Sequence, residues 1–152
     1  MLRIVLLAAL GLAVAPRVAA AGGGRIQIAS VVDESPGGAI DHRVNTTIVQ
    51  HALATLIAQE RRDHGNTRHL DVAVVSLHVA ALRDSVVVSA KVRITVSADH
   101  GTLLQVIAGG ARVEIAKRAY RERRLAELRD DALTGAVQAV FRKVKRSYTP
   151  PE

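Results

Sequence analysis

The chain has 152 residues, of which 49% are hydrophobic and 2% aromatic, and its formal net charge at pH 7 is +7. Its only aromatic residues are Tyr120, Phe141 and Tyr148, so it lacks the stacking platforms that usually hold single-stranded nucleic acids and sugars. We therefore expect neither ligand. The chain has no cysteine, so we expect no disulfide, no thiol nucleophile and no acylated cysteine at a mature N-terminus.

Residues 1–21 have the pattern of an export signal peptide. Arg3 supplies the positive charge, residues 4–15 are apolar, and the small residues 19–21 precede a glycine linker at 22–24. The apolar stretch is shorter than the roughly 20 residues that a membrane-spanning helix needs. The pattern therefore predicts a protein that works outside the cytoplasm.

We expect cleavage near Ala21 and a periplasmic or secreted product, whose net charge falls to about +5 because two arginines leave with the signal. An uncleaved signal that anchors the chain is the alternative, since Arg17 lies unusually close to the cleavage site. The remaining 25–148 segment is long enough for one domain with its own core, followed by a short tail at 149–152.

The first half of the domain shows a strand, a turn and a helix. Alternating residues from 25 to 32 predict a strand with Ile26, Ile28 and Val32 on one face. A polar turn follows, and apolar spacing over 40–62 predicts a helix with Asp41 as its N-cap. Its two apolar rows are Val44, Ile48 and Ala52, and Val49, Leu53, Leu56 and Ile57; Gly65 and Asn66 supply the stop.

Three strands follow, over residues 70–81, 86–96 and 103–115. The first is apolar on both faces, with Leu70, Val72 and Val74 opposed to Val75, Leu77 and Val79, which places it centrally in the sheet. The second alternates cleanly, so one face is buried and the other solvated, as in an antiparallel sheet. The 98–101 segment predicts a hairpin turn, and Gly109–Gly110 a bulge or a bend.

Residues 117–147 predict a long closing helix with an apolar stripe from Leu125 to Val144. The order is strand, helix, three strands, helix. We therefore expect a single α+β domain, with a mostly antiparallel four-stranded sheet whose apolar face is covered by both helices.

The polar residues give little support to catalysis. The pairs Asp41–His42, Asp63–His64 and Asp99–His100 lie at a helix start, a helix end and a hairpin tip, whereas metal ligands must converge on one point. We interpret them as turn and surface residues, and expect neither a metal nor a cofactor. His51 and His78 are interpreted as hydrogen-bonded core or rim residues. Asp33–Glu34 and Asp130–Asp131 are interpreted as solvated carboxylates, and nucleophile-elbow and phosphate-loop motifs are missing.

The strongest charge feature is a basic cluster at the start of the predicted last helix, made up of Lys117, Arg118, Arg121, Arg123 and Arg124. Cations at a helix N-terminus oppose the helix dipole, so the fold alone does not account for them. They are candidates for binding an anionic partner.

Several segments together carry a family resemblance: RIQIASVVDES, IVQHALATLIAQ, VVVSAKVRITVSADHGTLLQVIAGGARVEI and LRDDALTGAVQAVFRKV. The arrangement resembles small periplasmic domains related to the curli-secretion pore protein and to the N-terminal domain of the TolB translocation protein. The matching hairpin turn here is 99–103. The resemblance implies an envelope accessory or assembly domain, and it carries over no functional residue.

We therefore expect a non-enzymatic envelope protein that contacts an envelope partner or a second copy through the exposed sheet face, a sheet edge or the basic helix. The alternative is a module that binds anionic lipid or acidic polymer through the basic cluster. A hydrolase built on His64, His69 and a carboxylate is a third and weaker hypothesis.

Overall fold

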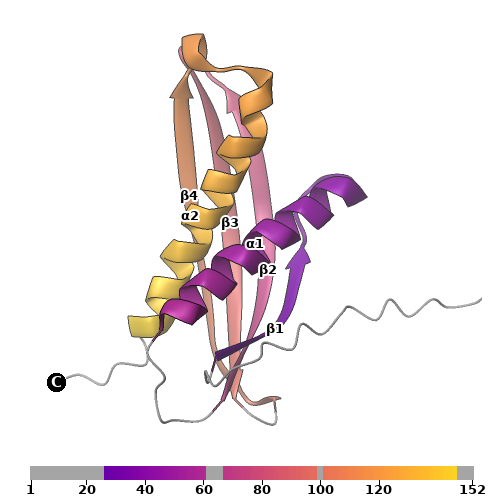
Figure 1. Cartoon of the computed structure of the whole chain (residues 1–152), viewed down its shortest axis with the longest axis vertical. Helices are drawn as coiled ribbons and strands as arrows, with labels where there is room; N and C mark the ends of the chain where they lie inside the picture. The colour runs from indigo at the N-terminus through magenta and orange to yellow at the C-terminus, as the bar shows by residue number, and fades with distance from the viewer. Residues whose placement is uncertain (1–25, 61–66, 99–100, 147–152) are drawn as a thin grey trace, which may run out of the picture.

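The computed structural model describes residues 26–60, 67–98 and 101–146. It contains one four-stranded sheet and two helices in the predicted order (Figure 1). The elements are β1 (Ile26–Asp33), α1 (Ala39–Gln59), β2 (Arg68–Ala81), β3 (Ser85–Ala98), β4 (Leu103–Ala116), the short 3-10 turns η2 (Lys117–Ala119) and η3 (Glu122–Arg124), and α2 (Leu125–Arg146). The predicted signal peptide, glycine linker and C-terminal tail lie outside the described residues, as do Asp63–His64 and Asp99–His100.

The strands follow the order β1-β2-β3-β4, with β1 parallel to β2 and the other two pairs antiparallel. The predicted α+β class and mostly antiparallel sheet are therefore confirmed, with β2 in the interior of the sheet. The three long strands have 14 residues each, whereas β1 has eight and pairs only with the first half of β2. One end of the sheet carries the start of β1 and the β3–β4 hairpin, and the other carries the β2–β3 turn.

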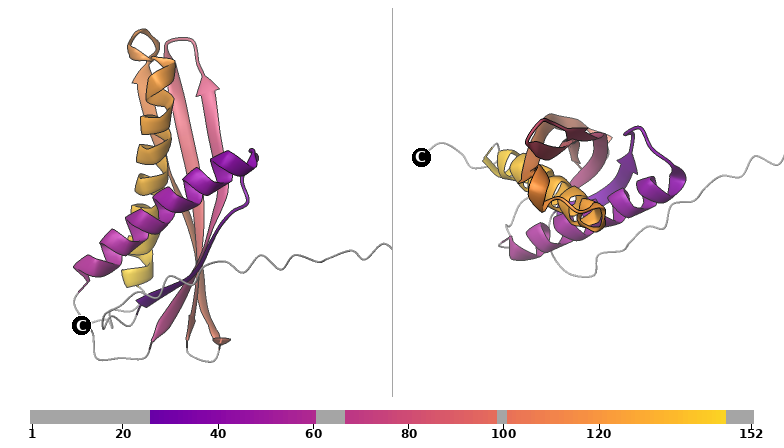
Figure 2. Two further views of the ribbon diagram at one scale, coloured as in Figure 1. Left: turned by 45° about the vertical axis from the view of Figure 1, so that its right-hand side comes forward. Right: turned by 90° about the horizontal axis from the view of Figure 1, so that it is seen from above.

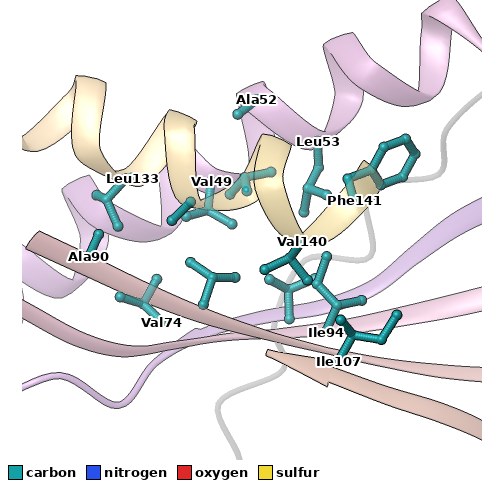
Figure 3. Packing of buried hydrophobic residues seen from close by; sticks show 14 of the residues in the cluster. Val49, Ala52, Leu53, Val74, Ala90, Ile94, Ile107, Leu133, Val140 and Phe141 are labelled. Atoms are coloured by element: carbon teal, nitrogen blue, oxygen red, sulfur yellow. The ribbon is translucent and has the colours of Figure 1, made fainter. Parts of the chain in front are cut away.

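Both helices lie on the same face of the sheet and cross over it, as two views show (Figure 2). The buried face of β3 is continuous, because all its even-numbered residues from Val86 to Val96 are buried, as predicted. They pack with one side of each helix into a single aliphatic cluster (Figure 3). Its largest fully buried side chains are Phe141, Leu53, Leu70, Ile94 and Leu133.

Two β-bulges change which residues face this core. In β1 the register shifts between Ile28 and Ser30, so Val31 packs on the core, whereas Val32 is 46% exposed. The prediction that Val32 shares the face of Ile28 was wrong, because one extra residue reverses the alternation that follows it.

In β2 the shift falls between Val74 and Ser76, which returns Leu77 to the core face. The prediction of two opposed apolar faces in β2 was therefore wrong. The bulge lets one core face continue as far as Leu77.

Helix α1 begins and ends earlier than predicted. Its N-cap is Gly38, and Asp41 lies inside the first turn, where its carboxylate accepts a hydrogen bond from Arg129 of α2 at 3.1 Å. The prediction of Asp41 as the cap was wrong because the helix already begins at Ala39. Val44 is 52% exposed, so it does not belong to the buried row, whereas Val49 and Leu53 are fully buried as expected.

The closing helix α2 begins at Leu125, eight residues later than predicted. Residues 117–124 instead form the two 3-10 turns that reverse the chain from the end of β4 onto the face of the sheet. Tyr120 and Leu125 pack on the core and hold this connection in place. The predicted apolar stripe of α2 is confirmed from Leu128 to Val144.

The glycine pair in β4 does not form a bulge, because the register with β3 is regular from Val96 to Ser85. A Cβ added at Gly110 would lie 2.5 Å from the carbonyl oxygen of Ala90. One added at Gly109 would lie 2.9 Å from Cγ2 of Val140 in α2. These glycines therefore allow close approach between the backbone of β4 and its neighbours, which is a second role of glycine within strands.

Candidate functional site

The outer edge of β4 is the longest unpaired edge of the sheet in the described part of the chain, since β4 pairs only with β3. Two hydrogen bonds show which of its backbone groups face outward. The N–H of Lys117 donates to the carbonyl of Asp84, directly opposite, at 2.8 Å, so odd-numbered residues of this regular ladder bond to β3. Lys143 of α2 donates to the carbonyl of Ala108 at 3.4 Å, so even-numbered residues point away from β3.

The first half of this edge is apolar and uncharged. Leu103, Leu104 and Val106 are 60%, 47% and 53% exposed, and no charged residue occurs from Leu103 to Ala111. Proteins usually protect a free edge with lysine, proline, a bulge or a covering element. Along 103–111 the protection consists of a bulge at Leu104, where the register with β3 shifts between Val96 and Ser97, and of the single bond from Lys143 to Ala108.

The other free edges are shorter or interrupted. The β1 edge spans eight residues and is broken by the bulge after Ile28. The second half of β2, beyond its pairing with β1, leaves residues 76–81 open on one side. Short and bulged strands are poor templates for an added strand, so β4, whose pairing with β3 is regular over the 12 residues from Gln105 to Ala116, offers the best pairing edge of the described sheet.

The opposite sheet face is polar, as the alternation of β3 predicted. Lys91 is exposed there, and Arg93 pairs with Glu34 at 2.9 Å. His78 is exposed on this side of the sheet. The interpretation that it could be a core residue was therefore wrong.

The five predicted basic residues lie in the connection between β4 and α2, and all are exposed. Two of them serve the connection itself. Arg121 donates to the carbonyls of Tyr120 and Arg118 at 2.8 and 3.1 Å, and Arg124 pairs with Glu127 at 3.3 Å. The side chains of Lys117, Arg118 and Arg123 make no hydrogen bond or ion pair among the described residues, so their charges are available to a partner.

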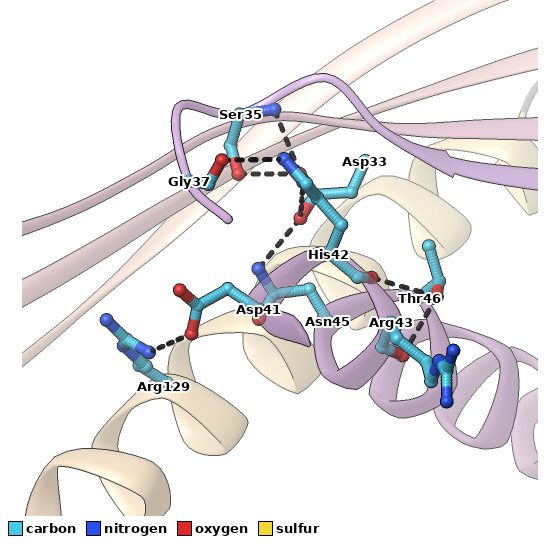
Figure 4. Close-up of polar contacts among 9 residues, drawn as sticks. All are labelled: Asp33, Ser35, Gly37, Asp41, His42, Arg43, Asn45, Thr46 and Arg129. Carbon is cyan, nitrogen blue, oxygen red and sulfur yellow. Dashed lines mark hydrogen bonds and ion pairs between the residues drawn. The ribbon is translucent and has the colours of Figure 1, made fainter. Parts of the chain in front are cut away.

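A polar cluster that the sequence did not reveal lies where β1 turns into α1 (Figure 4). The side chain of Asp33 is fully buried, and its carboxylate accepts hydrogen bonds from the N–H and Oγ of Ser35 at 2.9 and 2.6 Å, and from Nδ2 of Asn45 at 2.8 Å. His42 places Nδ1 3.0 Å from the same carboxylate and Nε2 3.1 Å from the carbonyl of Gly37.

Burial raises the pKa of Asp33, but the hydrogen bonds from Ser35, Asn45 and His42 outweigh this effect and lower the pKa below its ordinary value. The interpretation of Asp33 as a solvated carboxylate was therefore wrong, whereas Glu34, Asp130 and Asp131 are exposed. The cluster ties the turn to the helix, and the carboxylate of Asp33 is occupied by its hydrogen bonds within the fold.

The remaining polar residues do not assemble into a reactive centre within the described ranges. No group of three or more His, Asp or Glu side chains there is arranged to hold a metal ion. His51 is exposed on α1, in an open groove between the helices that is also lined by Ile48, Leu56, Asp130 and Thr134. His42 contacts Asp33 rather than its sequence neighbour Asp41.

No family model matches this chain, and no curated protein matches it. Solved structures with the same fold do exist. The minor lipoprotein from Acinetobacter baumannii is similar with a TM-score of 0.51 and 13% identity, over 78% of this chain and 91% of that one. Rare lipoprotein B from Shewanella oneidensis gives a TM-score of 0.49 and 14% identity, over 78% and 95%. At such identities the likeness establishes the fold alone.

These similar structures are bacterial lipoproteins, and none of them is a curli-secretion or TolB protein. The fold is therefore shared with bacterial lipoproteins, and the resemblance to the curli-secretion and TolB domains stays a prediction. Within the described residues, neither helix is long and apolar enough to span a membrane.

Proposed function

We propose that this protein is a non-enzymatic accessory or assembly protein of the bacterial cell envelope, and that it acts by pairing the free edge of β4 with an extended segment of another protein chain. The observation that carries the proposal is the uncharged edge at Leu103–Ala111, with three large apolar side chains about half exposed or more. An added strand would satisfy the outward backbone groups and cover these side chains together.

Two observations support the envelope as the place of action. The leading 1–21 segment has the pattern of an export signal. The similar structure from Acinetobacter baumannii is that of a lipoprotein, a class of envelope proteins. A binding role is favoured over catalysis because the carboxylate of Asp33, at the centre of the best-organised polar cluster, is occupied by Ser35 and Asn45 and forms part of the fold.

Photo-crosslinking from two matched positions tests the contact. Val106 on β4 and Val32 on β1 are valines with similar exposure, 53% and 46%. A photoreactive amino acid at 106, in cells that produce the full chain, is expected to give one discrete crosslinked species, either a second protein or a second copy. The same amino acid at 32 is expected to give none. No discrete species from 106, or the same species from both positions, would contradict the proposal.

A backbone variant separates strand pairing from side-chain contact. The N–H of Val106 points outward and makes no bond to β3, so Val106→Pro removes a donor that the fold does not use. Val106→Thr keeps this donor and the β-branched shape. With the crosslinker moved to Leu104, we expect the yield to collapse in the proline variant and to persist in the threonine variant. Equal yields would argue against an added strand.

A further inference from the structure

The fold brings together cations from two distant segments at one end of the molecule. The β2–β3 turn contributes Arg83, and the connection after β4 contributes Lys117, Arg118 and Arg123. The two segments are joined by the hydrogen bond from the N–H of Lys117 to the carbonyl of Asp84 at 2.8 Å. Figures 1 and 2 show them side by side at the end of the sheet opposite to the start of β1.

Exposed apolar side chains lie beside these cations. Leu82, in the same turn as Arg83, is 46% exposed, and Val79, near the end of β2, is 44% exposed. We call the surface formed by Val79, Leu82, Arg83, Lys117, Arg118 and Arg123 the basic tip. Its four cations make no hydrogen bond or ion pair among the residues that the structure describes. The sequence indicated only part of it, because Arg83 and Leu82 are more than 30 residues away from the basic cluster.

The charge at this end is positive even when the neighbouring charged groups are included. Glu114, which accepts a hydrogen bond from Ser85, is neutralised by Arg112 at 3.1 Å. Arg121 and Arg124 add two cations, against the carboxylates of Asp84, Glu122 and Glu127. Arg124 and Glu127 neutralise each other at 3.3 Å, and the remaining groups leave an excess of positive charge. An anionic partner is therefore favoured at the basic tip.

We propose that the basic tip docks on the surface of a bilayer that contains anionic phospholipid. Projecting apolar side chains ringed by Lys and Arg fit a headgroup layer, in which the cations meet phosphates and the apolar groups enter the acyl boundary. An acidic polymer would use the cations but leave Leu82 and Val79 in water. The proposal is independent of the β4 contact.

The geometry allows both contacts at once. The uncharged half of β4 begins at the far end of the sheet, and a 14-residue strand is roughly 45 Å long at about 3.3 Å per residue. With the basic tip on a membrane, Leu103 to Val106 would lie far from the lipid surface and remain open to a protein partner.

Vesicle flotation of the purified full chain tests the proposal. We expect binding to vesicles of phosphatidylcholine with about one third phosphatidylglycerol, little binding to phosphatidylcholine alone, and release as salt shortens the screening length from about 10 Å to about 3 Å. Residues 1–25 are common to every variant, so any binding through them is the same in all comparisons.

The deciding comparison uses two triple variants with the same change in charge. Lys117→Gln, Arg118→Gln and Arg123→Gln together are expected to weaken binding to the anionic vesicles about 100-fold, because each cation near the surface contributes roughly a fivefold factor. The control carries Lys91→Gln, Arg142→Gln and Arg146→Gln, at exposed positions six residues along β3 from Ser85 and at least 17 residues along α2 from Leu125. We expect it to bind within about twofold of the parent, since its cations lie beyond a Debye length of the docked surface.

Other results would overturn the proposal. Equal weakening by both triple variants would mean that net charge alone drives binding. Capture on heparin or polyglutamate without vesicle binding would assign the basic tip to an acidic polymer. Leu82→Ser leaves every charge in place and is expected to weaken vesicle binding about tenfold, since a buried leucine contributes to insertion. Unchanged binding by this variant would contradict docking into the headgroup layer.

Discussion

The buried carboxylate of Asp33 gives the sharpest prediction for stability. Replacing it by alanine leaves the N–H of Ser35 and the amide of Asn45 without their acceptor, and Asn45 is only 3% exposed. Each hydrogen bond to a charged group contributes about 1.5–3 kcal/mol, so losing two predicts a loss of about 3–6 kcal/mol in the free energy of unfolding. That is a large part of the roughly 5–15 kcal/mol that a domain of this size has.

The matched control for this variant is Asp71→Ala. Asp71 accepts one hydrogen bond, from Ser30 at 2.5 Å, on an exposed surface. We expect its loss to cost less than about 1 kcal/mol, since water can replace the partner. Urea unfolding at pH 7, followed by circular dichroism, measures both variants. If Asp33→Ala costs no more than Asp71→Ala, the cluster at the β1–α1 turn does not stabilise the fold as described.

The pH dependence follows from the direction of the pKa shift. The pKa of Asp33 is lower in the folded chain than in the unfolded chain, so its contribution to stability is present above the unfolded value of about 3.9 and is lost as pH falls through the folded pKa. The stability difference between the parent and Asp33→Asn is therefore expected to shrink on acidification below pH 4. A difference that grows as pH falls would reverse the assigned sign.

Two further predictions concern the core and the glycines of β4. Gly110→Ala places a Cβ against the backbone of β3 and is expected to lower the free energy of unfolding by about 1–3 kcal/mol. Gly38→Ala, whose Cβ meets nothing within 4 Å, is expected to change it by less than about 0.5 kcal/mol. Equal effects of the two variants in thermal unfolding would contradict the close approach of β4 to β3. Phe141→Ala opens a cavity between α2 and the rest of the core and is expected to lower the free energy of unfolding by about 3–5 kcal/mol. Val106→Ala, at an exposed position, is expected to lower it by less than about 0.5 kcal/mol. A loss below about 1 kcal/mol for Phe141→Ala would contradict the place of this ring in the core.

The order of the elements could be predicted from the sequence because the apolar spacing is strong in β3 and α2. The alternation of Val86 to Val96 and the stripe from Leu128 to Val144 each have one period over many residues, and both are buried as expected. The faces of β1 and β2 could not be predicted in full. A single inserted residue reverses the alternation, and nothing in a stretch such as Val74–Val75–Ser76 distinguishes a bulge from an apolar second face.

The polar residues were predicted less well, because their roles depend on contacts between distant segments. Asp33 has the sequence surroundings of an exposed turn, yet Asn45 and His42, about one helical turn apart on α1, cover it. The basic residues at 117–124 stood out by charge alone. Their neighbours Leu82 and Arg83 become visible only when the β2–β3 turn is seen beside the connection.

Residue-resolved amide hydrogen exchange by NMR, with and without the partner captured from Val106, tests the pairing of β4 most directly. In the free chain we expect slow exchange at Ile107 and Gly109, whose N–H groups bond to β3, and fast exchange at Val106 and Gly110, whose N–H groups point outward. In the complex, the N–H groups of Val106 and Gly110 are expected to become protected as well. Protection that leaves these two amides unchanged would contradict strand addition at this edge.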